Sequence, residues 1–200
     1  MPLKRFVTKH SLVAMAASLA LPLASISTSA ADVPDAKKTT LGLYMTAVEA
    51  GEIVQKSPAQ VLLIDVRTPA EVMFIGSPTV TDANVPFVDL KSPPEWDEQN
   101  NRLLLVPNPA FVGDVEARLA AKNLAKDAQV IVMCRSGDRS GKAVDALAKA
   151  GFTNAWTVLD GFEGDVSKDG RRDVNGWRVA GLPWAYKLDK SKLSITAGNK

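Results

Sequence analysis

The sequence predicts an α/β domain in which a mostly parallel central sheet is flanked by helices. Three short apolar runs, at residues 61–64, 130–133 and 155–159, have the length and the β-branched content of buried strands. Segments with helical signals separate these runs, and strands that alternate with helices favour parallel pairing. Ligands bind such sheets at the carboxyl ends of the strands, where Asp65 and Cys134 follow two of the runs.

Local signals mark where the helices begin. Residues 46–49 (Thr-Ala-Val-Glu) and 68–71 (Thr-Pro-Ala-Glu) both fit a capping box, and the second places proline at the first helical position. From residue 108 onward an apolar residue recurs every fourth position, which predicts an amphipathic helix. Residues 141–150 predict a further helix, which follows the apolar run 130–133 after a seven-residue loop, so the order of elements is that of an α/β protein.

Residues 1–31 are predicted to be a cleavable secretory signal peptide. A basic start is followed at residues 11–26 by a mostly apolar segment that is short for a membrane span, and small residues precede Asp32. An uncleaved membrane anchor is the alternative. The paired arginines of a twin-arginine signal are absent, so we expect ordinary export, to the bacterial periplasm.

Cleavage would change the charge of the chain and remove its only histidine, His10. Of the 24 Lys and Arg residues, three lie in the signal segment, which leaves 21 against 22 Asp and Glu and a net charge of −1. We therefore expect neither nucleic acid nor, after cleavage, a membrane as a partner. Mechanisms that pair serine or cysteine with histidine, and histidine–metal sites, are excluded from such a mature chain.

Cys134 is the only cysteine in the chain. An intramolecular disulfide, a Cys-x-x-Cys redox motif and a cysteine zinc site are therefore excluded, and we expect no metal and no cofactor. A single cysteine can be a small buried apolar residue and nothing more. Here, however, it opens the loop 134–140 (Cys-Arg-Ser-Gly-Asp-Arg-Ser) between a strand and a helix, where backbone N–H groups and the helix N-terminus favour the thiolate.

This strand, loop and helix closely resemble the active-site region of the rhodanese family of sulfurtransferases. Three further segments are similar to the family in their order along the chain: Asp-Val-Arg-Thr-Pro-Ala-Glu at 65–71, Ala-Asn-Val-Pro at 83–86, and Trp with Gly-Leu-Pro within 177–184. The resemblance spans about residues 45–186.

The resemblance implies a single rhodanese-like domain with a three-layer fold. We place this domain at residues 41–188, after a loose polar leader at 32–40 and before a C-terminal tail at 189–200. Two irregular stretches, 91–101 and 161–176, are expected to be either rim loops that choose a substrate or partner, or solvated insertions.

A rhodanese-type sulfurtransferase implies a catalytic Cys134 that carries sulfur as a persulfide in a ping-pong reaction. The donor would be a small sulfur-containing anion such as thiosulfate, or a persulfide, and the acceptor a thiol, including one on a protein, or cyanide. The residues expected to bind the substrate and cradle its sulfur are those of the rest of the loop: Arg135, Ser136, Gly137, Asp138, Arg139 and Ser140.

The roles of individual loop residues remain open at the level of sequence. Either Arg135 or Arg139 can contact the anionic donor, since both carry fixed positive charge. Ser140 can donate to the sulfur or cap the helix. Asp138 is expected to face outward, because a carboxylate near the site would repel an anionic substrate.

Three charged residues of the Asp-Val-Arg segment are expected to give structural support. Buried charges need partners, and Asp65, Arg67 and Glu71 could supply one another while they brace the loop.

Two other functions are compatible with the sequence. One is a sulfur-relay or binding module with little turnover of free thiosulfate. The other is a cysteine phosphatase or arsenate reductase, whose loop runs Cys-x5-Arg. Cys134 to Arg139 is Cys-x4-Arg, one residue shorter, and Met133 stands where such phosphatases carry histidine, so the sulfurtransferase is favoured.

Overall fold

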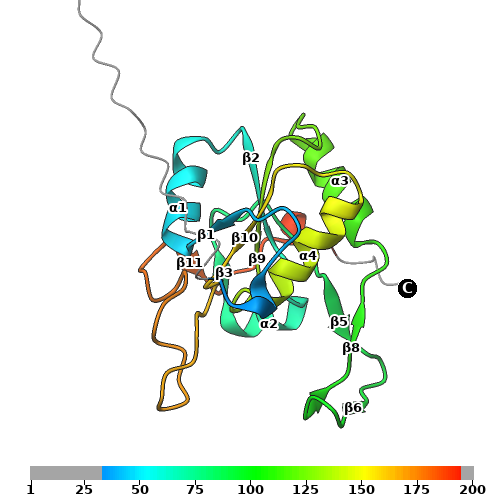
Figure 1. Ribbon diagram of the computed structural model, residues 1–200, viewed down its shortest axis with the longest axis vertical. Helices are drawn as coiled ribbons and strands as arrows, with labels where there is room; N and C mark the ends of the chain where they lie inside the picture. The colour runs from blue at the N-terminus through cyan, green and yellow to red at the C-terminus, as the bar shows by residue number, and fades with distance from the viewer. Residues whose placement is uncertain (1–32, 195–200) are drawn as a thin grey trace, which may run out of the picture.

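Five parallel strands form the central sheet of the protein, which a computed structural model describes over residues 33–194 (Figure 1). The predicted signal peptide and its cleavage position lie outside the described residues. The spatial order is β1-β10-β9-β2-β4, and every neighbouring pair is parallel. The strands are β1 (Tyr44–Met45), β10 (Ala155–Val158), β9 (Gln129–Met133), β2 (Val61–Asp65) and β4 (Ala83–Asn84). The predicted parallel α/β fold is confirmed.

Helices cover both faces of this sheet and complete the three layers. The four helices of the described chain are α1 (Ala47–Lys56), α2 (Pro69–Ile75), α3 (Phe111–Ala121) and α4 (Asp138–Lys149). One core packs α3 and α4 against one face, and a second core packs α1 and the buried Trp177 against the other. Figure 1 shows α1 on one side of the sheet and α3 and α4 on the opposite side.

Both predicted capping boxes are present. Thr68 Oγ1 accepts the N–H of Glu71 at 3.2 Å while the Glu71 carboxylate accepts the N–H of Thr68 at 3.0 Å, and Thr46 and Glu49 repeat the arrangement at α1. The helix expected from residue 108 begins at Phe111, after a turn, and the helix expected from residue 141 begins earlier, at Asp138. Helix α2 therefore starts immediately after β2, at the edge of the sheet where Asp65 lies.

A β-arm and a long loop project from the end of the molecule at which α2 lies (Figure 1). In the arm, β5 (Val88–Leu90) pairs with β8 (Leu105–Pro107), and β6 (Trp96–Asp97) pairs with β7 (Arg102–Leu103). Most of the stretch 91–101 is a loop, as expected, but Trp96–Asp97 within it form a strand, and residues 98–101 are the turn of the hairpin. A ribbon with both faces exposed shows no apolar alternation from which to predict it. Residues 161–176 contain neither helix nor strand, as predicted.

The segment expected to be a loose leader is packed against the domain. Val33 is buried, a short 3-10 helix, η2 (Asp35–Lys37), lies against α4, and the N–H of Thr40 donates to Asp145 at 2.7 Å. The polar composition suggested a solvated segment, but the partners of these residues are supplied by helices and loops more than a hundred positions away.

The C-terminal segment closes one edge of the sheet. β11 (Trp184–Ala185) pairs antiparallel with β3 (Ser77–Pro78), and the 3-10 helix η3 (Lys190–Lys192) follows. The N–H of Ser194 donates to the carbonyl of Asn84 at 2.9 Å, so the expected tail covers the free edge of β4 over its described part. Within residues 33–194, none of the helices has the length and hydropathy needed to cross a bilayer.

Candidate active site at Cys134

Cys134 lies directly after β9, at the carboxyl edge of the sheet, and only 1% of its surface is exposed. Its sulfur accepts the backbone N–H of Gly137 at 3.2 Å. Gly137 is the N-cap of α4 and has a backbone φ of +102°, a conformation that residues other than glycine rarely adopt. The loop therefore turns back on its own cysteine, and the sulfur sits beside a backbone donor at the N-terminal end of a 12-residue helix.

The first residues of the loop 161–176 hold the cysteine loop from outside. The N–H of Phe162 donates to the carbonyl of Cys134 at 2.8 Å, and the N–H of Glu163 donates to that of Arg135 at 3.0 Å. Gly161 makes this approach possible, because a Cβ there would lie 2.6 Å from the Cys134 carbonyl oxygen. The root of this loop is thus part of the site, which composition alone could not indicate.

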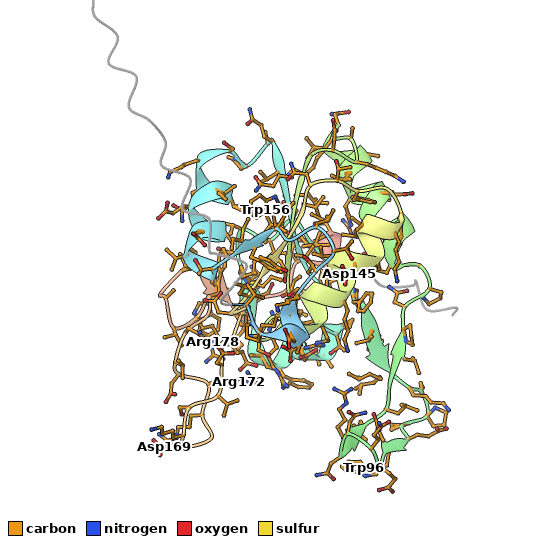
Figure 2. The ribbon with its side chains drawn as sticks, viewed as in Figure 1. Trp96, Asp145, Trp156, Asp169, Arg172 and Arg178 are labelled. Atoms are coloured by element: carbon orange, nitrogen blue, oxygen red, sulfur yellow. The ribbon has the colours of Figure 1, made fainter. Side chains whose placement is uncertain are left out.

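Side chains near the base of the same loop fix its path away from the site. Arg178 pairs with Glu163 and lies over the ring of Trp184, with 4.9 Å from its guanidinium carbon to the ring centre. Arg172 donates to the carbonyl of Gly164. Figure 2 shows Arg172 and Arg178 near the body of the molecule, Asp169 at the far end of this loop and Trp96 at the end of the β-arm.

Arg139 is engaged by Glu71 and not free to bind a substrate in this arrangement. Its two terminal nitrogens donate to the two carboxylate oxygens of Glu71 at 2.6 and 2.5 Å. Burial favours the neutral acid, but the hydrogen bonds and charge of Arg139 outweigh it and lower the pKa of Glu71 to about 2. Glu71 thus has two roles, since it also caps α2, and the pair ties α2 to α4 across the site.

This ion pair makes the stability of the protein depend on pH. Glu71 has its pKa lowered from 4.5 to about 2, so its contribution is fully present above pH 4.5 and is lost as the pH falls towards 2. We expect Glu71→Gln to lower the free energy of unfolding at pH 7 by about 2–3 kcal/mol. Urea unfolding at several pH values should show the difference between the two proteins shrinking below pH 4.5. A difference that does not vary with pH would contradict the assignment, and Glu52→Gln is the control.

Arg135 is the loop arginine that remains available to an anionic ligand. Its side chain is exposed, and it makes no ion pair within residues 33–194. Asp138 is also exposed, as expected from its charge. Of the two arginines that the sequence left as alternatives for substrate contact, the geometry favours Arg135.

The serines of the loop contribute to its shape. Ser140 is fully buried, and its hydroxyl donates to the carbonyl of Gly137 at 2.8 Å and lies 2.7 Å from the hydroxyl of Thr157 on β10. It neither caps α4 as its N-cap residue nor hydrogen-bonds to the sulfur. Ser136 is half-buried. The link from Ser140 to Thr157 fastens the first turn of α4 to the sheet.

Asp65 and Arg67 form a fully buried ion pair at the end of β2. Arg67 donates from Nη2 at 2.5 Å and from Nε at 2.9 Å to the carboxylate of Asp65, and its Nη2 also donates to the carbonyl of Gly76. The guanidinium carbon lies 4.1 Å from the centre of the Phe162 ring. We expected Asp65, Arg67 and Glu71 to pair with one another. Asp65 does pair with Arg67, but Glu71 pairs with Arg139.

Asn84 joins this brace and was not among the predicted site residues. Its side-chain amide donates to the carbonyls of Asp65 and Arg67 at 2.9 and 2.8 Å. Asn84 lies in the Ala-Asn-Val-Pro segment that resembles the family, and this position could have indicated that it belongs to the site. The Glu71–Arg139 pair had no comparable signal, because the two residues are 68 positions apart.

Two surface cavities lie away from the cysteine. One, of about 560 Å³, lies between α2, β3 and residues 185–193, and the other, of about 720 Å³, lies beside the start of α3. Residues 134–140 line neither. Over the described part of the chain, no cluster of three or more His, Cys, Asp or Glu side chains is arranged to hold a metal ion. The candidate site is Cys134 with its loop, residues 134–140.

Comparisons with known proteins agree with this geometry. The family model for the rhodanese-like domain matches residues 46–168. Protein RP600 of Rickettsia prowazekii, itself uncharacterized, is 28% identical over 125 residues, which cover 62% of this chain and 82% of that protein.

Solved structures show the same likeness. Rv0390 from M. tuberculosis superposes with a TM-score of 0.56 at 30% identity, over 72% of this chain and 97% of that one. The polysulfide-sulfur transferase homodimer of Wolinella succinogenes matches at 23% identity with a TM-score of 0.42, over 72% of this chain and 77% of that one. The match to the family model spans more than half of the sequence, and the chain belongs to the rhodanese-like domain family.

Proposed function

We propose that the protein is a sulfurtransferase that carries sulfane sulfur as a persulfide on Cys134. The observation that carries the proposal is the single cysteine of the chain, held at the head of α4 with the Gly137 N–H on its sulfur. A backbone donor in this position stabilises negative charge on sulfur, both on the attacking thiolate and on the persulfide. No other cysteine is present to resolve the persulfide as an internal disulfide.

The reaction with thiosulfate proceeds in two displacements. The Cys134 thiolate attacks the outer sulfur of the donor, the sulfur–sulfur bond of the donor breaks, and sulfite leaves with the electron pair. An acceptor thiolate or cyanide then attacks the terminal sulfur of the Cys134 persulfide and releases the Cys134 thiolate. Arg135, exposed and unpaired within the described chain, is the residue we assign to the sulfonate end of the donor.

Neither displacement needs a general base or a cofactor. Sulfite leaves the donor, and the Cys134 thiolate leaves the persulfide, as anions that need no proton. The short Cys-x4-Arg loop also suits a single sulfur atom better than a tetrahedral oxyanion, and its arginine, Arg139, is taken up by Glu71. These features favour the sulfurtransferase over a phosphatase.

The test is the intact mass of the purified protein before and after incubation with thiosulfate, with Cys134→Ser as the control. We expect a gain of one sulfur atom in the parent protein, reversed by cyanide and absent from the variant. The protein should be purified from the periplasmic fraction, because we also propose that it is exported.

Other outcomes would redirect the proposal. If no sulfur is added although iodoacetamide alkylates Cys134, thiosulfate is not the donor. Loading from a low-molecular-weight persulfide under the same conditions would then support the relay module. Hydrolysis of a phosphate ester, absent in Cys134→Ser, would support the phosphatase instead.

A further inference from the structure

Lys37 is a buried cation on the segment that precedes β1, outside the part of the chain that matches the family model. Only 9% of the residue is exposed, and its Nζ donates to the carbonyl of Leu159 at 2.9 Å and to Asp165 at 3.1 Å. Lysine is rarely buried, and a buried ammonium group needs such partners. The contact is therefore a specific one, and it brings the N-terminal segment to the end of β10 next to the cysteine loop.

The stem of Lys37 lies against the glycine that donates to the sulfur. A Cβ on Gly137 would lie 2.9 Å from Cδ of Lys37 and 2.2 Å from the carbonyl oxygen of Leu159. The backbone of Gly137 is thus enclosed by the lysine stem and by the very carbonyl that the lysine ammonium binds. One turn further along α4, Gly141 lies close to the carbonyl of Lys37, since a Cβ there would be 3.2 Å away.

The other partner of Lys37 belongs to the loop that holds the cysteine from outside. Asp165 follows directly after residues 162–164, whose N–H groups donate to the carbonyls of Cys134 and Arg135. Burial would raise the pKa of Asp165, but hydrogen bonds from Asn175 and Lys37 hold it below its ordinary value. Lys37 therefore links α4, the end of β10 and the loop 161–176, which are the elements that enclose the cysteine loop.

We infer that Lys37 is a positioning residue of the Cys134 site: through its stem and the Leu159 carbonyl, it holds the Gly137 N–H on the sulfur. The Lys37 ammonium also offsets the partial negative charge of the Leu159 carbonyl oxygen, which lies beside Gly137 and would otherwise disfavour an anion on the sulfur. The inference rests on the proposed function, in which the stabilised sulfur anion carries the sulfane sulfur. It extends the site to a segment that the sequence indicated to be a loose leader.

The experiment compares Lys37→Met with Lys38→Met in the full chain. Methionine keeps most of the stem of Lys37 and removes the ammonium. Lys38 is the matched control, because its side chain is 52% exposed and pairs only with the exposed Asp35 within the described chain. Two rates are measured at neutral pH: alkylation of Cys134 by iodoacetamide, and sulfur loading from thiosulfate. We expect Lys37→Met to slow both about tenfold, and Lys38→Met to leave both unchanged.

The pH profile of alkylation separates positioning from packing. If Lys37 stabilises the sulfur anion through Gly137, the loss in Lys37→Met shrinks at high pH, where a thiol ionises without help. If Lys37 only packs, its removal loosens the loop around a cysteine that is almost fully covered, and alkylation is as fast as in the parent protein or faster at every pH. That second result, even with a lower melting temperature, overturns the inference.

A milder variant covers the case in which Lys37→Met does not fold. Asp165→Asn acts at a side chain that is 47% exposed and leaves Lys37 with Leu159 as its acceptor. We expect alkylation of Cys134 to be about threefold slower in Asp165→Asn, the size of effect expected when a half-exposed ion pair is lost. An unchanged rate counts against the inference. Alkylation needs no sulfur donor. A parent protein that is alkylated but takes up no sulfur from thiosulfate or from a persulfide therefore contradicts the proposed function and leaves the comparison at Lys37 valid.

Discussion

Asp65→Asn should lower the free energy of unfolding by about 3–5 kcal/mol, which is the effect of leaving one charge of a buried ion pair without its partner. Neither Asp65 nor Arg67 has any exposed side-chain surface, and Asp65 makes the only ion pair of Arg67 within the described chain. The Arg67 Nη1 already lacks a hydrogen-bond partner. Asparagine keeps the size of the side chain, so the loss reports on charge. Urea unfolding followed by tryptophan fluorescence measures it.

A double-mutant cycle shows whether the pair itself is responsible. Arg67→Met added to Asp65→Asn removes the stranded charge, and we expect the double variant to recover part of the lost stability. The control is Glu52→Gln, at an exposed carboxylate that pairs with Lys56, where the expected change is below about 0.5 kcal/mol. An Asp65→Asn variant within 1 kcal/mol of the parent protein would mean that Arg67 finds other compensation.

The same pair also supports the cysteine loop, because β2 and β9 are neighbours in the sheet. Asp65 lies opposite Met133 in the register, and the N–H of Val66 donates to the carbonyl of Met133 at 2.8 Å. The two strands therefore end together, with Cys134 next in the chain. We expect Asp65→Asn to slow sulfur loading as well as to destabilise the fold.

Gly137→Ala should abolish most sulfur loading, by about a hundredfold or more, because it displaces the N–H that donates to the sulfur. An added methyl group would lie 2.2 Å from the Leu159 carbonyl oxygen, and the residue has φ +102°. The methyl group would clash with the backbone carbonyl of Leu159, and rotation of a side chain cannot relieve a backbone clash. The loop itself must therefore move. Strain of this kind destabilises a fold by about 1–3 kcal/mol. Intact mass after thiosulfate and urea unfolding measure the two effects.

Gly113→Ala is the matched control, because it makes the same chemical change but is expected to change the free energy of unfolding in the opposite direction. Gly113 lies within α3, and a methyl group there would meet no atom within 4 Å. Alanine in a helix is more favourable than glycine by about 0.5–1 kcal/mol, so stability should rise and sulfur loading should stay unchanged. If Gly137→Ala loads sulfur like the parent protein, the backbone donor has no part in the reaction.

Several features were predictable because their physical causes are local. Both capping boxes depend on residues three positions apart, and the apolar runs that became β2 and β9 needed only their own composition. The position of Cys134 at the carboxyl edge of the sheet followed from that order of elements. The arm at 88–107 was only partly foreseen, because a ribbon with two exposed faces has no apolar pattern.

The partners of the charged residues could not be read in the same way. Arg135 and Arg139 were equivalent candidates for the substrate, and only the approach of Glu71 from another helix distinguishes them. Lys37 lay in a segment without apolar periodicity, and its acceptors are 122 and 128 positions away. Hydrogen bonds over such separations depend on how the helices pack on the sheet, which the local sequence does not specify.

From the sequence alone we could predict the three central strands, the helix starts, and the loop that carries the only cysteine, because apolar runs, capping signals and a unique residue type are local properties. The tertiary structure decided which groups surround that loop: Glu71 on Arg139, the residues after Gly161 on its carbonyls, and Lys37 beside Gly137. Charge and hydrogen-bonding capacity are properties of single residues, but which partner satisfies them depends on distance in the folded chain.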